Sequence, residues 1–397
     1  MNDTSITLIP KVFNPQYILQ YRPISLCPVA YKIAVKAITN RLRIWMNEIV
    51  GEEQSAFVPS RLITDNVLVA FESVHTMRRR KKGKNYSCAV KLDMMKAYDR
   101  VEWVFLERMM IKLGFCTEWV TMVMRCLSTV RFSVKLNGGL SEHFLPSRGL
   151  RQGDPISPYL FLLCVEGFSA LLKEAQQNNL LRGVQFGTQG PRVTHLLFAD
   201  DSIVFLEGTS RSMQTLRRVL QDYEASSGQR VNLQKSSVFF GKGCTDELKT
   251  SLKAEIGIKC EALSERYLGL PTVVGRSKDG YFKYITERSW GKIKGWKGQG
   301  MSQAAKGVLV KSVLQAVPAY PMSCFLLPKK QCNKLSSISS NFWWGDTDGQ
   351  HKVHWIGWDR MCRSKNQGGL GFRDYECFNQ AFLAKHDQQY KNKNHLD

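Results

Sequence analysis

Three aspartates stand at the ends of apolar segments, where a carboxylate is costly unless a positive group faces it. Asp93 follows an apolar run and lies within "KLDMMKAYDR" (91–100), just ahead of a helix-like segment. Asp200 and Asp201 form an acidic turn in "VTHLLFADDSIVFLEG" (193–208), between two runs typical of short strands. No lysine or arginine lies within this segment. Two carboxylates so close together favour a hard divalent cation, so the pair predicts a site for Mg²⁺ or Mn²⁺.

Two interpretations of Asp93 remain open at this point. If its strand and the acidic turn belong to one sheet, the three carboxylates can meet and hold two metal ions about 3.5–4 Å apart. Such a site suits phosphoryl transfer, because one ion activates the attacking hydroxyl and the other stabilises charge on the phosphates. The alternative is a buried salt bridge between Asp93 and one of three neighbouring cations, Lys91, Lys96 or Arg100.

The charge of the chain indicates a polyanionic partner. Lysine and arginine number 56 against 34 acidic residues, a net charge of +22, which favours nucleic acid first and an anionic membrane second. The most apolar stretch (160–172) is too short to span a membrane and predicts a core helix, so we expect no membrane partner. The first residues lack a secretory signal, and the odd count of 11 cysteines favours reduced thiols. We therefore expect an intracellular protein, cytoplasmic or nuclear, that is not secreted.

The elements that must position these aspartates alternate between helix and strand. Residues 28–50 and 66–82 carry apolar side chains at helical spacing. Residues 87–93 are strand-like, and a helix is expected from about Val101, with Asp99 as its cap. The pattern predicts a mixed α and β protein.

Seven segments of the chain stand in a fixed order: "YRPISL" (21–26), "QSAFVPSRLITDN" (54–66), "KLDMMKAYDRVEW" (91–103), "RGLRQGDPISPYLF" (148–161), "HLLFADD" (195–201), "VNLQKS" (231–236) and "YLGLP" (267–271). This series resembles the successive blocks of reverse transcriptases from non-LTR (LINE-type) retrotransposons, and the plant branch most closely. The resemblance runs from about residue 8 to about residue 275, and seven blocks in order are far more specific than any one.

This resemblance implies an α+β fold of the right-hand polymerase type. It places fingers with an N-terminal extension at 1–86, and a palm with an antiparallel sheet at 87–275. A further fingers segment is expected around 115–150. A helical thumb and part of the region after the polymerase are expected at 276–397.

The implied activity is that of an RNA-directed DNA polymerase, which transfers a nucleotide from a dNTP to a primer 3′-hydroxyl. Its partners are an RNA template, a DNA primer and dNTPs, and its cofactors are two Mg²⁺ (or Mn²⁺) ions. The resemblance makes Asp93, Asp200 and Asp201 the catalytic, metal-binding triad. Phe198 and Ala199 stand where retroviral enzymes carry a tyrosine and a variable residue, and the Phe-Ala form is usual in this branch.

Four residues match nucleotide-binding positions of the family, and each also has a purely structural explanation. Tyr98 matches the aromatic gate that disfavours a 2′-hydroxyl, although a core aromatic at a helix start is the alternative. Arg61 matches a fingers arginine that contacts the triphosphate, and the alternative is a solvated surface arginine. Gln152 and Gly153 match the loop beside the nascent base pair, although a tight turn before a helix explains them too.

Two further positions follow from the same resemblance. Lys235 matches a lysine that can donate a proton to departing pyrophosphate. Tyr267, Leu268 and Gly269 resemble the primer grip, which positions the 3′ end. The basic run at 78–84 is a nuclear-import signal, a phosphate-binding strip or a solvated loop.

The sequence leaves rival functions to be separated. The chain begins almost directly at the first block, and no endonuclease or RNase H region fits, so we expect a fragment of a mobile element. The first alternative is therefore a truncated, catalytically inactive remnant that binds nucleic acid. A group II intron maturase-like protein is a third possibility, which the plant-type blocks disfavour.

Overall fold

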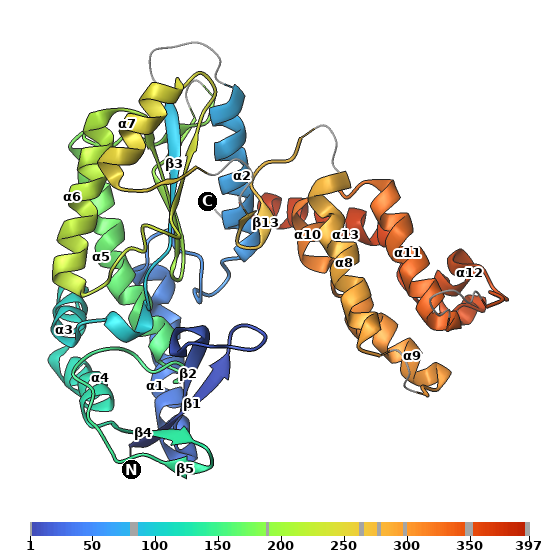
Figure 1. Ribbon diagram of the computed structural model, residues 1–397, viewed down its shortest axis with the longest axis horizontal. Coiled ribbons are helices and arrows are strands. Elements are labelled where there is room, and N and C mark those ends of the chain that lie inside the picture. Colours follow the sequence, from blue (N-terminus) through green and yellow to red (C-terminus); the bar gives the residue numbers. More distant parts are fainter. Residues whose placement is uncertain are drawn as a thin grey trace. The chain divides into compact units, whose positions relative to one another are not determined.

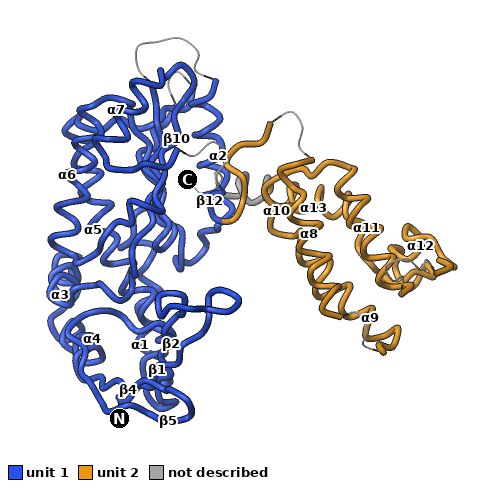
Figure 2. The backbone as a smooth tube through the Cα atoms, viewed as in Figure 1, with its two compact units in different colours: residues 1–268 blue, residues 269–397 orange. Residues whose placement is uncertain are grey.

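The chain folds into two compact units, residues 1–268 and 269–397 (Figure 2). Their division falls a few residues before the boundary expected at residue 276. The computed structural model describes residues 2–79, 86–187, 190–261, 266–275, 279–296, 300–345 and 352–393.

The first unit contains a five-stranded sheet of order β11-β10-β3-β9-β8, whose strand β3 is labelled in Figure 1. Its middle strand β3 (Ser87–Leu92) pairs antiparallel with β9 (Asp201–Glu207) and with β10 (Ser237–Phe240). The edge strand β8 (His195–Phe198) is antiparallel to β9, and β11 (Cys260–Glu261) is parallel to β10. The apolar runs on both sides of the acidic turn are therefore neighbouring strands of one sheet.

Helices bury this sheet and build the core around it. α5 (Ser157–Gln177) packs against α3 (Trp103–Lys112) and α6 (Ser210–Ser227), and α6 packs against α7 (Asp246–Ile256). α2 (Ile63–Arg79) contacts β3 and β8. The apolar stretch at 160–172 lies inside α5 and is mostly buried, which agrees with the expected core helix. Within the described residues, no helix has the length and apolar character needed to cross a membrane.

A second, four-stranded sheet joins the N-terminal region to a later segment. Its order is β2-β1-β4-β5, in which β1 (Asp3–Pro10) is antiparallel to β2 (Tyr21–Leu26) and parallel to β4 (Arg131–Leu136). β5 (Gly139–Leu140) extends the edge beyond β4, and α1 (Val29–Ile49) follows β2. The sheet therefore places residues from 131 to 140 beside the N-terminal strands.

The expected cap of the helix near Val101 was wrong. The helix begins later, as α3, and no side-chain hydrogen bond caps it. Asp99 lies instead in a short 3₁₀ turn before the helix. The cause is long-range backbone pairing, because the Leu150 N–H donates to the Tyr98 carbonyl (2.7 Å) and the Gly149 N–H donates to the Val101 carbonyl (2.8 Å). These bonds fix the entry to the helix without a side-chain cap.

The second unit is helical. α11 (Lys329–Trp344) packs against α8 (Asp279–Lys294) and α13 (Tyr375–Lys393), and α13 also packs against α10 (Ala319–Cys324). In its core, the hydroxyl groups of Tyr375 and Ser339 lie 2.7 Å apart. Together with the sheets of the first unit, these helices confirm the α+β class. The helices of this unit are α8 (Asp279–Lys294), α9 (Gln303–Leu309), α10 (Ala319–Cys324), α11 (Lys329–Trp344), α12 (Trp358–Cys362) and α13 (Tyr375–Lys393).

Candidate active site

Strand register brings Asp93 opposite Asp201 at one end of the five-stranded sheet. In the β3–β9 pair, Leu92 is the partner of Ser202. The next positions along the two antiparallel strands are Asp93 and Asp201, which therefore face each other across the strand ends. Two of the predicted residues, which lie more than 100 positions apart in the chain, are neighbours here.

The third aspartate lies in the adjoining turn. Phe198 pairs with Asp201 across β8 and β9, which leaves Ala199 and Asp200 as a two-residue connection. Ala199 has a φ of 53°, in the left-handed region. Its N–H donates to Oε1 of Gln54 at 3.0 Å, and Gln54 is 1% exposed. A buried side chain from a distant segment therefore holds the residue just before Asp200.

The segment around Gln54 also holds the edge strand β8. Gln54 forms a parallel bridge with Leu197, whose N–H donates to the Glu53 carbonyl (2.8 Å). The Leu197 carbonyl accepts from the Ser55 N–H (3.2 Å) and from Nδ2 of Asn66 (2.8 Å). Part of the block at 54–66 thus fixes the strand that leads into the acidic turn, a role that the sequence did not indicate.

The backbone of Asp93 is fixed from the opposite side. Its N–H donates to Oγ of Ser236 (3.1 Å), and its carbonyl accepts from the Asn232 N–H (2.8 Å). Ser236 is fully buried, and its hydroxyl also donates to the Asn232 carbonyl (2.8 Å). Lys235 lies in the same turn and is exposed. The turn that carries Lys235 is therefore bonded directly to the backbone of Asp93.

The three carboxylates repel one another. Burial, then Asp200 and, more weakly, Asp93 raise the pKa of Asp201, while Lys91 lowers it. Among the described residues, Asp93 forms no ion pair with any of its neighbouring cations, and the Lys91 ammonium donates to the Arg266 carbonyl at 3.0 Å. Clustered carboxylates at the end of a sheet are suited to binding a divalent cation.

The cluster is not a closed set of ligands. In the described parts of the chain, no three carboxylate, imidazole or thiol groups converge as a ready-made metal site. Register and turn geometry bring the three Cα positions together, while Asp200 is exposed and Asp93 and Asp201 are half-buried. Two carboxylates on fixed strand ends and a third in the adjoining turn supply the hard oxygen donors that a divalent cation would take.

The raised pKa of Asp201 predicts a pH-dependent gain in stability from Asp201→Asn. The carboxyl has a higher pKa in the folded chain than in the unfolded one, so its contribution to stability is complete below the unfolded pKa and is lost as pH rises through the folded pKa. We expect the variant to melt a few degrees above the parent at pH 7 in chelator. The difference should shrink as the pH falls and vanish below the unfolded pKa of about 3.9, as calorimetry at several pH values would show. An equal difference at every pH would contradict this origin.

A cavity of about 460 Å³ lies beside the acidic turn. Three predicted residues line it: Asp200, Tyr98 and Gln152. Lys11 and Arg22, from the first hairpin of the N-terminal sheet, line it as well. The cavity thus combines the carboxylate of Asp200, an aromatic ring, an amide and cationic side chains.

Tyr98 lies flat against a core aromatic ring. Its ring centroid is 5.0 Å from that of Phe161, with an interplanar angle of 13°. Burial, assisted by the charge of Asp200, raises the pKa of Tyr98 to about 12, so its hydroxyl stays protonated at neutral pH. The ring therefore belongs both to the edge of the core and to the wall of the cavity, and the two interpretations of Tyr98 are compatible.

Gly153 has a backbone conformation that favours glycine, and its surroundings leave little room for a side chain. Its φ is 110°, and a Cβ atom at this position would lie 3.0 Å from the Ser25 carbonyl oxygen. The Ser25 N–H donates to the carbonyl of Gln152 at 2.8 Å. The turn before α5 is therefore bonded to β2, and this contact sets where the Gln152 side chain enters the cavity.

Arg22 and Lys11 were missed by the sequence analysis. Arg22 is exposed and belongs to "YRPISL", a block that was identified without assigning its arginine a role. The Lys11 ammonium donates to the Leu19 carbonyl (3.1 Å) across the hairpin. Only the pairing of β1 with β2 brings both cations to the cavity, and this pairing has no local sequence signal.

Arg61 is not among the residues that line the cavity. Its Nη1 donates to the carbonyls of Gly51 and Gln54, and its Nη2 donates to the Val50 carbonyl (2.8 Å). A further contact reaches the Asn47 carbonyl at 3.4 Å. The guanidinium thus satisfies carbonyls at the C-terminal end of α1. Its role as a nucleotide contact stays a prediction.

The residues predicted to form the primer grip, 267–269, lie where the chain passes from the first unit to the second. Tyr267 is 1% exposed at the end of β12 (Arg266–Tyr267), and β13 (Leu270–Pro271) begins the second unit. Leu268 and Gly269 both have positive φ, as do the two central residues of a type I′ turn. Most of the basic run at 78–84 lies outside the described residues.

Comparison with known families shows which family the chain belongs to. The profile of "Reverse transcriptase (RNA-dependent DNA polymerase)" matches residues 10–272. The chain belongs to the reverse transcriptase family. The match covers all seven segments identified in the sequence and confirms the resemblance drawn from them.

Proteins of retroelements are among the similar sequences. A 149 kDa protein of transposon TX1 from Xenopus laevis is 26% identical over 92% of this chain and 27% of that protein. A Pol polyprotein of retrotransposable element R2DM from Drosophila melanogaster is 26% identical over 63% of this chain and 23% of its own length. An uncharacterized mitochondrial protein of Arabidopsis thaliana is 51% identical over 18% of this chain and 46% of that protein. The chain spans about a quarter of the two longer relatives. These relatives support placing this reverse transcriptase with non-LTR elements and include a plant protein.

Solved structures of telomerase are also similar. Apo telomerase from Candida tropicalis aligns with 86% of this chain and 57% of its own, at a TM-score of 0.47 and 12% identity. Telomerase from Candida albicans, solved with a fragment of telomeric RNA, gives a TM-score of 0.44 and 14% identity over 86% of this chain and 59% of its own.

Proposed function

We propose that the chain is the RNA-directed DNA polymerase core of a LINE-type retroelement, which joins a dNTP to a primer 3′-hydroxyl on an RNA template. The observation that carries this proposal is the β3–β9 register, which sets Asp93 opposite Asp201 beside the turn that holds Asp200. The adjoining cavity supplies room and cationic groups for a triphosphate.

The proposed metal ligands are Asp93, Asp200 and Asp201. They would hold two Mg²⁺ (or Mn²⁺) ions, and hard oxygen donors of this kind select such ions. When bound, the ions activate the attacking hydroxyl and neutralise charge on the phosphates. The protein contributes the fixed backbone of Asp93, the rigid turn before Asp200, and Lys235 as the proton donor to pyrophosphate.

The cavity residues take the proposed nucleotide roles. Arg22 and Lys11 bind the triphosphate, for which the planar fork of an arginine is well suited. The ring of Tyr98 lies under the sugar and disfavours a 2′-hydroxyl. Gln152 donates from its amide to the template or the nucleotide, and Gly153 allows the backbone to approach the nascent base pair.

The polymerase subdomains are assigned by applying the family resemblance to the elements of the fold. The four-stranded sheet and α1 form the fingers, including the segment around 115–150. The five-stranded sheet with α5 and α6 forms the palm, and residues 267–269 serve as the primer grip. The helical second unit serves as the thumb and the region that follows it. All eleven cysteines are free, which supports a site of action inside the cell, in the cytoplasm or the nucleus.

Primer extension tests the proposed function directly. The purified chain, given Mg²⁺, dTTP and poly(rA)–oligo(dT), should extend the primer, and it should stop when the metal is chelated. The rival function is binding of nucleic acid without catalysis, which the net charge of +22 also supports. Salt-sensitive binding of the primer–template with no extension would decide for the rival.

Gly153→Ala is expected to weaken nucleotide use and stability together. Alanine at this φ costs about 1–3 kcal/mol, and its methyl group would press on the Ser25 carbonyl. The turn must shift, so we expect the KM for dNTP to rise roughly tenfold, by about 1.4 kcal/mol of binding. The matched control is Gly280→Ala, whose added Cβ meets no atom within 4 Å and whose φ is not in the left-handed region. Unchanged kinetics in Gly153→Ala would contradict the assignment.

A further inference from the structure

A buried ion pair closes the turn that carries Gln152 and Gly153. Arg151 Nη2 lies 2.7 Å from Oδ2 of Asp154, and the two side chains are 3% and 0% exposed. The Asp154 N–H donates to the Arg151 carbonyl (3.4 Å), and Gly153 occupies the third position of the turn with positive φ. The pair therefore brackets the two residues that face the proposed nucleotide and the strand β2.

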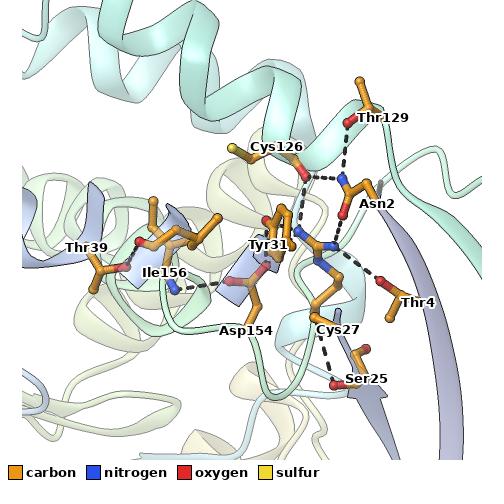
Figure 3. Close-up of polar contacts among 12 residues, drawn as sticks. Asn2, Thr4, Ser25, Cys27, Tyr31, Thr39, Cys126, Thr129, Asp154 and Ile156 are labelled. Carbon is orange, nitrogen blue, oxygen red and sulfur yellow. Dashed lines mark hydrogen bonds and ion pairs between the residues drawn. The ribbon is translucent and has the colours of Figure 1, made fainter. Parts of the chain in front are cut away.

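Tyr31 on α1 connects the two charges. Its hydroxyl donates to Asp154 Oδ2 at 2.9 Å and accepts from Arg151, whose guanidinium also lies 4.2 Å from the centroid of the ring. Figure 3 shows Tyr31 beside Asp154 in this network. Burial and the charge of Asp154 raise the pKa of Tyr31, so the hydroxyl keeps its proton and remains a donor.

The network reaches four further residues (Figure 3). The guanidinium donates to Oδ1 of Asn2 (2.6 Å), to Oγ1 of Thr4 in β1 (3.3 Å), and to the carbonyl of Cys126 in α4 (Thr117–Ser128; 3.1 Å). The aspartate accepts from the N–H of Ile156, just before α5 (3.3 Å). The turn is thus anchored to α1, α4, the start of α5 and the N-terminal strand β1.

Stability alone does not account for this arrangement. Moving two charges out of water is costly, and apolar side chains of similar volume often make a fold as stable as a buried ion pair does. What a charged and hydrogen-bonded pair adds is a single geometry, because each bond restricts direction as well as distance. The location of the pair, directly behind the turn, makes that geometry relevant to the cavity.

We infer that Arg151, Asp154 and Tyr31 are positioning residues that hold Gln152 and Gly153 in register with the incoming nucleotide. This inference rests on the proposed polymerase function. None of these three residues lines the 460 Å³ cavity. They act on it only through the turn, because Gln152 of the turn belongs to the lining. Loss of the network should therefore alter dNTP affinity and base selection more than the maximal rate.

The decisive variant replaces the network with apolar side chains: Arg151→Met, Asp154→Leu and Tyr31→Phe together. We expect a melting temperature close to that of the parent, a KM for dNTP raised about tenfold, more misincorporation, and a kcat changed far less. The amide of Ser25, which donates to the Gln152 carbonyl, should exchange its hydrogen faster. Unchanged KM, fidelity and Ser25 exchange would overturn the inference.

A milder variant and a control complete the test. Tyr31→Phe alone keeps the ion pair and should fold, and we expect its KM for dNTP to rise about two- to threefold. No change there, with the triple variant unfolded, would overturn the inference. Asp246→Asn breaks an ion pair of the same spacing, with Lys249 on the surface of α7, and should change nothing.

The proposed function and this inference fail in different ways. If the parent chain extends no primer, the polymerase assignment fails. Hydrogen exchange at Ser25 still tests the positioning role in that case, since it requires no catalysis. If the parent extends primers and the triple variant does so with the same KM and fidelity, only the positioning role fails.

Discussion

Asp201→Asn is expected to lower the rate of primer extension by about 10³-fold or more, equivalent to at least about 4 kcal/mol of activation free energy. The residue lies opposite Asp93 in the β3–β9 register and next to Asp200, so its loss removes one of three proposed metal ligands. Asparagine keeps the size of the side chain and one oxygen but loses the negative charge. Single-turnover extension of poly(rA)–oligo(dT) measures the effect.

Two measurements separate a lost ligand from a damaged fold. The variant should melt above the parent at pH 7 in chelator, because burial and its acidic neighbours raise the pKa of Asp201. Adding Mg²⁺ should raise the melting temperature of the parent and have much less effect on the variant, since only a ligand-binding fold gains stability from the ion. Asp222→Asn, an exposed carboxylate on α6, is the matched control and should extend primers normally. Extension by Asp201→Asn at the rate of Asp222→Asn would end the polymerase assignment.

The position of three aspartates at or beside the ends of apolar strands could be predicted because it depends on patterns that are local in the sequence, whereas their role as metal ligands stays a prediction. Asp93 directly follows β3, Asp201 begins β9, and Asp200 lies in the turn just before it, and the ends of neighbouring strands meet by simple geometry. The apolar runs also predicted the core helix α5 and the mixed class of the fold. The cap at Asp99 failed because backbone bonds from Gly149 and Leu150 determine that turn, and such bonds leave no local signal.

The residues that hold the site in place could not be predicted, because their bonds also join distant parts of the chain and leave no local signal. The amide of Gln54 accepts from Ala199, 145 positions away along the chain. Arg151 bonds to Asn2, 149 positions away. Glutamine, arginine and asparagine are common surface residues, so their types alone indicate nothing. Their roles follow only from burial and from partners that the fold brings together.

For Arg61 and Arg22, the contact with the triphosphate that the resemblance suggests differs from the one that the structure supports. Both arginines belong to segments of the reverse transcriptase resemblance, and only Arg61 was assigned to the triphosphate. The structure surrounds the guanidinium of Arg61 with the carbonyls of Gly51, Gln54 and Val50. It places Arg22 on the wall of the cavity that Asp200 also lines.

Arg22→Ala is therefore expected to lower kcat/KM for dNTP, and Arg61→Ala is expected to lower the stability of the fold. Loss of a charged hydrogen bond to a phosphate costs about 1.5–3 kcal/mol, so Arg22→Ala should lower kcat/KM for dNTP roughly 10- to 100-fold without changing the melting temperature. Arg22→Lys should recover part of the loss because it retains the charge. Arg61→Ala leaves several carbonyls without their donor, so we expect it to lower stability by about 1–3 kcal/mol and to change kcat/KM little below its melting range. Steady-state extension with varied dTTP and thermal melting of both variants provide the comparison. A large loss of kcat/KM in a well-folded Arg61→Ala variant, with Arg22→Ala unaffected, would contradict this assignment and identify Arg61 as the residue that contacts the triphosphate. The Arg61 guanidinium would then have to leave the carbonyls near the end of α1 when the nucleotide binds.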